Sequence, residues 1–223
     1  MKQWFDNPLL REISKPVLYL AVFALSGTLI LALIHAATAD RIAANERTAL
    51  LQRIEQILAD KDYDNDPLQD SIVLAHDDNR PLHSTTPVTI YRVRESGEPV
   101  TAVYALASPN GYNGSINLVI GVNADQTLSG VRVVSHRETP GLGDKIDIAK
   151  SEWIKSFAGK SLQNPGAGQW AVRKDGGDFD QFTGATITPR AVVNTVKDVL
   201  RWSQQHQQDL FTQATTTPEA QTN

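Results

Sequence analysis

The sequence contains no cysteine among its 223 residues. Disulfides, thiolate metal sites and iron–sulfur clusters are therefore excluded for this chain acting alone, so any redox chemistry must reside on a bound group. A strong charge of either sign is also lacking: the net charge is −4, and no basic stripe interleaved with aromatic residues occurs. Because nucleic-acid-binding domains carry such a stripe, we expect no nucleic-acid partner.

Long apolar runs are absent apart from one near the N-terminus. Residues 16–39 contain no Asp, Glu, Lys or Arg, and a run of this length can cross the roughly 30 Å of bilayer hydrocarbon as a helix. We therefore predict one transmembrane anchor at 16–39. Basic residues flank it on both sides, and their distribution favours a cytoplasmic segment at 1–15 and export of everything after the anchor.

A cleaved signal peptide is the alternative interpretation of this run. Ala37-Thr38-Ala39 has the small-x-small form of a cleavage site. The run is, however, longer than the apolar region of about 7–15 residues that signal peptides carry, and the charged leader before it is mixed in sign. Both features favour a retained anchor.

Apolar residues continue at helical spacing beyond the anchor. They predict a stalk helix over 41–59 followed by an acidic turn, which together make a segment at 40–66. Aspartates at alternate positions in this turn resemble the start of a calcium loop. Asn65 stands where such a loop requires glycine, and Ser71 stands where it requires a bidentate glutamate. We therefore expect a solvated acidic turn and no metal site.

Residues 67–208 alternate β-branched segments with turn sequences and are predicted to form one domain. The expected strands are 88–94, 99–107, 115–122, 128–134 and a short one at 169–173. The expected helices are 144–157 and 189–207, and the Thr- and Gln-rich tail at 209–223 is expected to be disordered. The predicted fold class is α+β: a single transmembrane helix, then a twisted antiparallel sheet with packed helices.

The segment HRETPGLGDK, residues 136–145, is smaller and more polar than a plain loop requires. Gly141 and Gly143 give a tight backbone that can lie flat against a planar group. Glu138 and Thr139 offer hydrogen bonds beside them. A glycine turn that ends a strand explains the same residues, so spacing alone leaves both interpretations open.

The segment DQFTGAT, residues 180–186, precedes the last predicted helix. Thr188 followed by Pro189 is typical of an N-cap with proline at the first helical position. Thr183, Thr186 and Thr188 offer hydroxyls near a helix N-terminus, where the macrodipole favours a phosphate. An ordinary capped helix is the alternative, because the segment is neither a P-loop nor a dinucleotide fingerprint.

DQFTGAT resembles the flavinylation motif Asp-x-x-Ser/Thr-Gly-Ala-Thr, whose last threonine carries FMN through a phosphoester bond made by a flavin transferase. ETPGLG, within residues 136–145, is similar to the second signature of the same FMN-binding domain. That domain occurs in the C subunit of the sodium-pumping NADH:quinone reductase and in the G subunit of the Rnf electron-transport complex. FTGATITPRAVV looks closer to the Rnf G subunit, and the resemblance extends from the anchor to the last helix.

The resemblance implies that FMN is attached covalently to Thr186 and that the segment at 111–115 corresponds loosely to one that contacts the flavin ring. The other cofactor-binding residues that it implies are Thr183, Gly184 and Ala185 around the phosphate, and Glu138, Thr139, Leu142 and Gly143 along the isoalloxazine ring or ribityl chain. No residue is implied to be catalytic in its own right.

The function implied by the resemblance is electron transfer within a membrane oxidoreductase complex that couples electron flow to ion translocation. The chain would lie in the bacterial inner membrane with its C-terminal domain in the periplasm. Its partners would be the other subunits of the complex and, for maturation, a flavin transferase. Two alternatives remain: an anchored flavin-dependent reductase that acts alone, and a structural or binding subunit without flavin.

Overall fold

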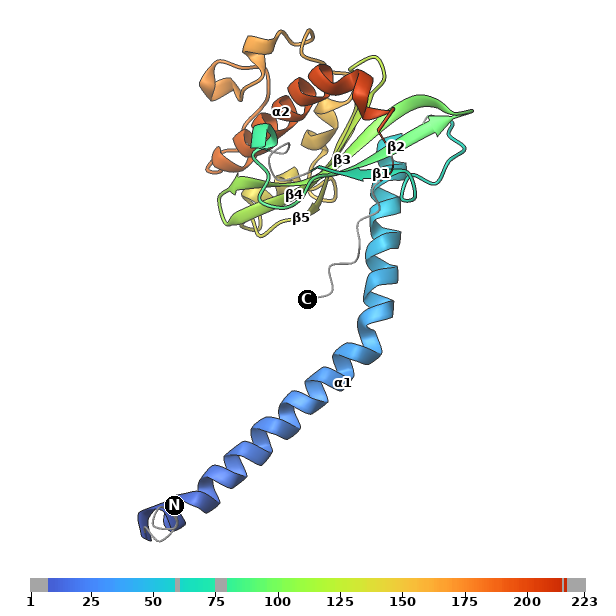
Figure 1. Ribbon diagram of the computed structural model, residues 1–223. Helices are drawn as coiled ribbons and strands as arrows, with labels where there is room; N and C mark the ends of the chain where they lie inside the picture. Colours follow the sequence, from blue (N-terminus) through green and yellow to red (C-terminus); the bar gives the residue numbers. More distant parts are fainter. Residues whose placement is uncertain (1–7, 59–60, 75–79, 214, 216–223) are drawn as a thin grey trace. The chain divides into compact units, whose positions relative to one another are not determined.

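The structure is a computed structural model that describes residues 8–58, 61–74, 80–213 and 215 (Figure 1). The chain divides into two compact units, Met1–Ala49 and Leu50–Asn223. Parts of four predicted segments lie outside the described residues: 1–7 of the cytoplasmic segment, 59–60 of the stalk and acidic turn, 75–79 of the predicted domain, and 214 and 216–223 of the tail.

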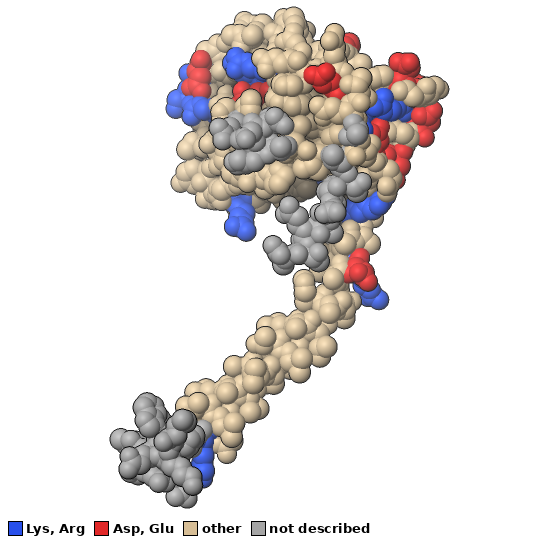
Figure 2. Space-filling model, in the orientation of Figure 1, with Lys and Arg blue, Asp and Glu red and all other residues tan. Residues whose placement is uncertain are grey.

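The first unit contains helix α1 (Pro8–Leu58) as far as Ala49, which includes the predicted anchor and the start of the predicted stalk; the last turns of the helix belong to the second unit. Helix α1 is long and apolar enough to cross a membrane, and Figure 2 shows a stretch of it without charged side chains on the visible face. The hydroxyls of Ser26, Thr28 and Thr38 donate to carbonyl oxygens three or four residues earlier, at 2.9, 2.9 and 2.8 Å. These bonds leave no free hydroxyl donor at the three positions, which a hydrocarbon environment would penalise.

The second unit contains a five-stranded antiparallel sheet in which every strand pairs with its neighbour in sequence. The strands are β1 (Ser71–Val73), β2 (Thr89–Glu95), β3 (Glu98–Gly111), β4 (Gly114–Asn123) and β5 (Leu128–Ser135). The prediction of an antiparallel sheet of four strands between 88 and 134 is confirmed. Strand β1 was not predicted, since three residues are too few to show an alternating pattern.

The main core lies between one face of this sheet and helix α2 (Ile187–Leu210), which Figure 1 shows crossing the sheet. Val192, Val196 and Val199 recur at helical spacing on α2 and are fully buried. They meet side chains of the central strands such as Tyr104 and Ile120, which are fully buried as well. This contact fixes where α2 begins and ends relative to the sheet.

The last turns of α1 cover the other face of the sheet. Ile54, Ile57 and Leu58 join a second, smaller core with Val103 and Val119 of β3 and β4. The helix can approach because the sheet carries glycines beneath it: a Cβ at position 121 would lie 2.5 Å from Ile57 Cγ2.

We predict that Gly121→Ala lowers the free energy of unfolding of the second unit by about 1–3 kcal/mol, because the added methyl overlaps Ile57. Gly130→Ala is the matched control, since a Cβ there meets its nearest atoms at 3.7 Å, and it should change stability by less than about 1 kcal/mol. Urea unfolding of the purified chain measures both. Equal losses in the two variants would contradict this account of the α1 contact.

The predicted helix at 144–157 is not one helix in the structure. Two short 3₁₀ helices, η2 (Gly143–Ile146) and η3 (Glu152–Phe157), take its place. The predicted pattern is interrupted because Asp147 and Ser151 turn their side chains to the backbone and accept the N–H groups of Ala149 and Trp153, at 2.9 and 3.1 Å. Such local bonds compete with a continuing helix.

The predicted strand at 169–173 is also wrong. Short 3₁₀ helices, η4 (Ala167–Gln169) and η5 (Arg173–Asp175), lie on either side of a fully buried Trp170, and Val172 makes an isolated parallel bridge to Phe179. A third element of this kind, η1 (Arg80–Leu82), precedes β2. Burial of Trp170, whose indole N–H donates to the Ser161 carbonyl at 2.9 Å, sets this segment in place of strand pairing.

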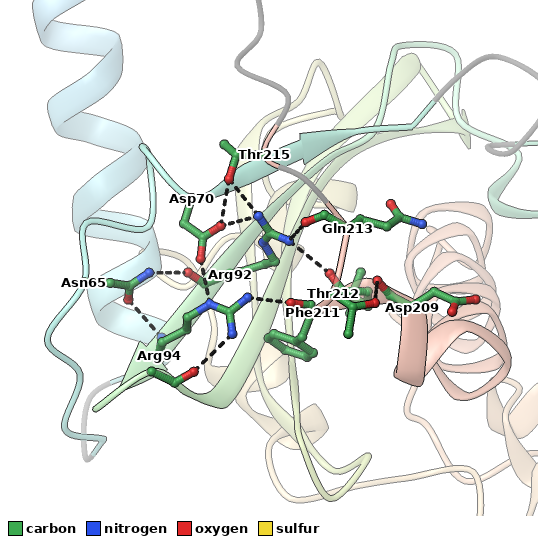
Figure 3. Close-up of polar contacts among 11 residues, drawn as sticks. Asn65, Asp70, Arg92, Arg94, Asp209, Phe211, Thr212, Gln213 and Thr215 are labelled. Carbon is green, nitrogen blue, oxygen red and sulfur yellow. Dashed lines mark hydrogen bonds and ion pairs between the residues drawn. The ribbon is translucent and has the colours of Figure 1, made fainter.

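Two arginines of β2 hold the C-terminal end of α2 (Figure 3). Arg92, which is only 2% exposed, donates to the Gln213 carbonyl at 2.6 Å, and Arg94 donates to the Phe211 carbonyl at 2.8 Å. The Asp70 carboxylate forms ion pairs with both guanidinium groups. Two buried or half-buried cations thereby gain one anionic partner and several carbonyl acceptors, as their burial requires.

Residues beyond the predicted domain boundary at 208 therefore make defined contacts. Helix α2 continues to Leu210, which is buried, and the Thr215 hydroxyl accepts from Arg92 Nη2 at 2.9 Å. The expectation of a disordered tail from 209 onwards differs from the structure at 209–213 and 215. No local pattern indicates these contacts, because the acceptors are backbone carbonyls whose partners lie over a hundred residues earlier.

Asp70 makes the stability of this unit depend on pH. Burial raises the pKa of Asp70, but the hydrogen bond from Arg94 and the charge of Arg92 outweigh burial, so its pKa lies below the ordinary value of 3.8. A lowered pKa in the folded state means that the carboxylate stabilises the fold above its ordinary pKa, and that this contribution is lost as the pH falls through the lowered value.

We predict that Asp70→Asn lowers the free energy of unfolding at pH 7 by about 3 kcal/mol, because Arg92 remains buried without its anion. The loss should shrink as the pH falls below 3.8, where the carboxylate of the unfolded chain becomes protonated, and should disappear below the lowered pKa of the folded state. Asp178→Asn is the control, because Asp178 pairs with Lys160 at the surface, and it should cost less than about 1 kcal/mol. Urea unfolding from pH 7 to pH 2 measures both; a loss for Asp70→Asn that stays constant over this range would contradict the assignment.

Candidate functional site

A cavity of about 230 Å³ lies at the N-terminal end of α2. Three segments distant in sequence form its walls: the β3–β4 turn, the loop that follows β5, and the loop that leads into α2 together with the first turn of that helix. The lining residues are Tyr112, Glu138, Thr139, Leu142, Gly143, Gly184, Ala185, Thr186, Ile187 and Thr188. The structure thus brings together seven of the eight cofactor-binding residues predicted from the sequence; Thr183, an exposed residue, is not among the lining residues.

The loop after β5 folds back on itself through the carbonyl of Thr139. This oxygen accepts the N–H groups of Leu142 and Gly143, each at 3.1 Å. Gly141 has φ +78°, a conformation that favours glycine. The turn leaves Leu142 with 43% of its surface exposed at the cavity. Two further large apolar residues that line the cavity, Tyr112 and Ile187, are exposed as well.

Glu138 lies beneath this loop and is only 5% exposed. Its Oε1 accepts the backbone N–H of Asn113 in the β3–β4 turn at 3.1 Å, and its Oε2 accepts the hydroxyl of Thr188 in α2. The Asn113 side chain adds a hydrogen bond to the Thr139 hydroxyl at 3.1 Å. The three walls of the cavity are therefore joined to one another by hydrogen bonds.

Helix α2 begins at Ile187, two residues before the predicted start at Pro189. The prediction that Thr188 is the N-cap is wrong, because its hydroxyl is used by Glu138, fifty residues earlier in the chain. Thr186 occupies the N-cap position, and its side chain makes no capping hydrogen bond. The first N–H groups of a helix lack partners within it, so this end of α2 favours an anion.

An aromatic cluster anchors the loop that carries Thr186. The indole N–H of Trp153 donates to the Asp180 carbonyl at 2.8 Å, and the rings of Trp153 and Phe182 meet edge to face at 5.2 Å. Gly184 has φ +82° and completes the tight turn before the helix. The Asp180 carboxylate pairs with Arg173 at the surface, at 2.7 Å, and is not part of the cavity lining.

Comparison with known proteins supports the grouping of these three walls. A family model for the FMN-binding domain matches residues 111–201, a range that includes every residue of the cavity lining. A second model, for the RnfG N-terminal region, matches residues 1–57.

Curated relatives match nearly the whole chain. The G subunit of the ion-translocating oxidoreductase complex of Vibrio cholerae is 45% identical over 205 residues, which cover 92% of this chain and 97% of the relative. The proteins of the same name from Pseudoalteromonas atlantica and Shewanella loihica are 43% and 42% identical, over 89% and 90% of this chain and 92% and 94% of their own lengths. This chain belongs to the family of these G subunits.

Three lining residues of the cavity are not among the predicted cofactor-binding residues. Thr188 was assigned to the helix cap. Ile187 lies between the segment that resembles the flavinylation motif and the predicted helix at 189–207 and was given no role, although it heads α2 at the cavity wall. Tyr112 lies in the segment that the resemblance related only loosely to a ring contact. The sequence offered one signal for Tyr112: it is a large side chain between two Asn-Gly pairs, and an exposed turn does not require a large side chain.

We predict that Gly143→Ala destabilises the domain by about 1–3 kcal/mol. A Cβ at this position would lie 2.8 Å from both Glu138 Oε2 and Thr188 Oγ1, and neither atom can retreat without breaking their mutual hydrogen bond. Gly168→Ala is the control, because nothing lies within 4 Å of a Cβ there; it should change stability by less than about 0.5 kcal/mol. Thermal unfolding compares the two, and a neutral Gly143→Ala would contradict the tight contact.

Proposed function

We propose that this chain carries FMN covalently on Thr186 and serves as an electron-transfer subunit of an ion-translocating membrane oxidoreductase complex. The observation that carries the proposal is the cavity at the start of α2, where the flavinylation motif and the ETPGLG segment form adjoining walls. A match to the motif alone does not require that a cavity is present. In this structure Glu138 and Thr188, fifty positions apart in sequence, line the same cavity.

The residues around the cavity suit a flavin phosphate at one end and a flat ring at the other. The start of α2 offers unpaired backbone N–H groups and the positive end of a 24-residue helix to an anion. Tyr112, Leu142 and Ile187 offer exposed apolar surface to a ring. The cavity is smaller than the roughly 300–1,000 Å³ of pockets that enclose a drug-sized ligand, so part of a flavin held there would remain accessible to a redox partner.

Thr186 fits the role of an attachment residue better than that of a nucleophile in turnover. Its hydroxyl makes no capping hydrogen bond to the helix, which leaves it available for a phosphoester. Among the described residues that line the cavity there is no histidine to activate a hydroxyl repeatedly. We therefore assign the modification to a separate flavin transferase.

When bound, the flavin supplies the electron chemistry that a chain without cysteine lacks. The chain's own part is to hold the phosphate at α2, to orient the ring against apolar side chains and to limit the access of water. The other subunits of the complex would bring the remaining electron carriers and the path for the ion. One spanning helix offers no such path.

We further propose that α1 anchors the chain in the bacterial inner membrane and that the second unit lies in the periplasm. Lys15 stands before the apolar run, and Arg41 and Arg47 stand after it, so the positive-inside comparison supports this orientation only when Lys2 and Arg11 are counted as well. Covalent attachment suits this location, because an exported protein cannot replace lost FMN from the cytoplasm.

The intact mass of the natively expressed chain should exceed its sequence mass by one FMN less one water. Thr186→Ala should lack this increment and the yellow fluorescence on a denaturing gel, whereas Thr186→Ser retains a hydroxyl and should keep both. Gln181→Ala is the control for disturbance of the loop, because Gln181 is exposed at a variable position of the motif and the attachment hydroxyl stays in place. An unmodified wild-type chain, or a modified Thr186→Ala, would overturn the assignment.

Affinity purification from the native membrane distinguishes the subunit from a reductase that acts alone. A subunit should bring integral-membrane partners with it in fixed proportion. A flavin-loaded chain that reduces a small acceptor and elutes without partners would favour the stand-alone reductase.

A further inference from the structure

The Glu138 carboxylate occupies a space that two glycines of other segments leave for it. A Cβ at Gly111, at the end of β3, would lie 2.8 Å from Glu138 Oε1. A Cβ at Gly143, in the loop after β5, would lie 2.8 Å from Glu138 Oε2. Each oxygen is thus packed against one glycine and hydrogen-bonded to one donor, Asn113 N–H for Oε1 and the Thr188 hydroxyl for Oε2.

Burying the Glu138 carboxylate in this way costs free energy of desolvation, and a residue that only contacts the flavin ring does not need to be buried. A carboxylate removed from water is strongly destabilising unless its oxygens are hydrogen-bonded. Both oxygens of Glu138 accept hydrogen bonds. A carboxyl group with both oxygens paired therefore lies within the wall of a cavity whose helix end favours an anion.

We propose that Glu138 is the positioning residue of the flavin site: it locks the β3–β4 turn, the loop after β5 and the first turn of α2 into one frame, and its charge lowers the reduction potential of the bound flavin. The effect on the reduction potential rests on the proposed function. The locking of the three segments concerns the chain itself and can be tested without flavin.

The locking role follows from which groups Glu138 joins. Asn113 neighbours Tyr112, and Thr188 neighbours Ile187, so the two donors are adjacent to the two apolar residues that flank the cavity. Loss of the carboxylate would release both at once. A residue whose only role is to contact the ring would leave the turn and the helix unaffected when removed.

The electrostatic role follows from position and burial. A fixed negative charge opposes the uptake of electrons by a group bound beside it, and low local polarity strengthens the effect. Glu138 lines the cavity and is almost entirely shielded from water. Its replacement by the isosteric, uncharged glutamine should therefore raise the potential of the flavin.

The first experiment uses the full chain bearing Thr186→Ala, so that no flavin is attached, and follows backbone hydrogen exchange. Addition of Glu138→Ala should speed exchange at Asn113 and at the start of α2 together, about tenfold or more, as expected for loss of hydrogen bonds to a charged group. Thr188→Val should also speed exchange at Asn113, because the two are linked through Glu138. Thr188→Ser, which keeps the hydroxyl, should change neither.

The second experiment measures the midpoint potential of the flavin in the flavinylated wild type, Glu138→Gln and Glu98→Gln by spectroelectrochemical titration. Glu138→Gln should shift the potential upward. Glu98→Gln removes an exposed carboxylate that does not line the cavity, so it should leave the potential unchanged. A purely structural role would alter the loading or the melting temperature of Glu138→Gln without this shift.

The outcomes separate the inference from the function on which it rests. A wild-type chain without FMN overturns the proposed function but leaves the exchange experiment valid. A flavinylated wild type whose Glu138→Gln variant has the same potential overturns the electrostatic role. Exchange that changes only next to residue 138 in Glu138→Ala, and not at all at Asn113 in Thr188→Val, overturns the locking role; if Glu138→Ala fails to fold, Thr188→Val alone decides it.

Discussion

The packing of α2 across the sheet is the constraint on which the rest of the second unit depends. Its buried valines hold the helix at a fixed position, so its first turn meets the β3–β4 turn and the loop after β5. The cavity exists only where these three ends converge. At the opposite end, Arg92 and Arg94 hold the helix against sliding along its axis, since their acceptors are backbone carbonyls just beyond its last turn. The cavity and the contacts of Arg92 and Arg94 therefore lie at the two ends of one helix.

The buried Glu138 carboxylate in the cavity wall has a cost to the stability of the fold. A buried carboxylate beside a helix end that favours an anion satisfies part of that preference before any ligand arrives. An apolar residue at position 138 would avoid the desolvation cost. The desolvation cost of Glu138 is explained if the carboxylate serves the flavin site, and for this reason we propose a role for Glu138 beyond packing.

Strands β2 to β5 could be predicted from the sequence because each is a segment of seven or more residues, rich in β-branched side chains, between turn sequences. The segment 144–182 could not, because its structure depends on buried aromatic rings and capping side chains, which have no period. Most of the site residues were identified by resemblance, whereas spacing alone left a plain helix cap equally acceptable. Thr188 shows the limit: its sequence neighbours indicate a cap, and only the fold brings Glu138 to it. The same applies to the residues after Leu210, whose partners on β2 no local pattern reveals.

The hydrogen bonds from Arg92 and Arg94 to the residues just after α2 have a consequence for the order of folding. Domains fold as units while the chain is synthesised from its N-terminus. The guanidinium groups on β2 bind acceptors at Phe211, Gln213 and Thr215, which are made after the sheet, the cavity walls and α2. Until then α2 is held by its buried apolar side chains and lacks the contacts of its C-terminal end, while Thr186 lies at its start. If Thr186 is the attachment residue proposed above, a transferase that requires α2 with all of these contacts would act on chains made to residue 215 and pass over shorter nascent ones.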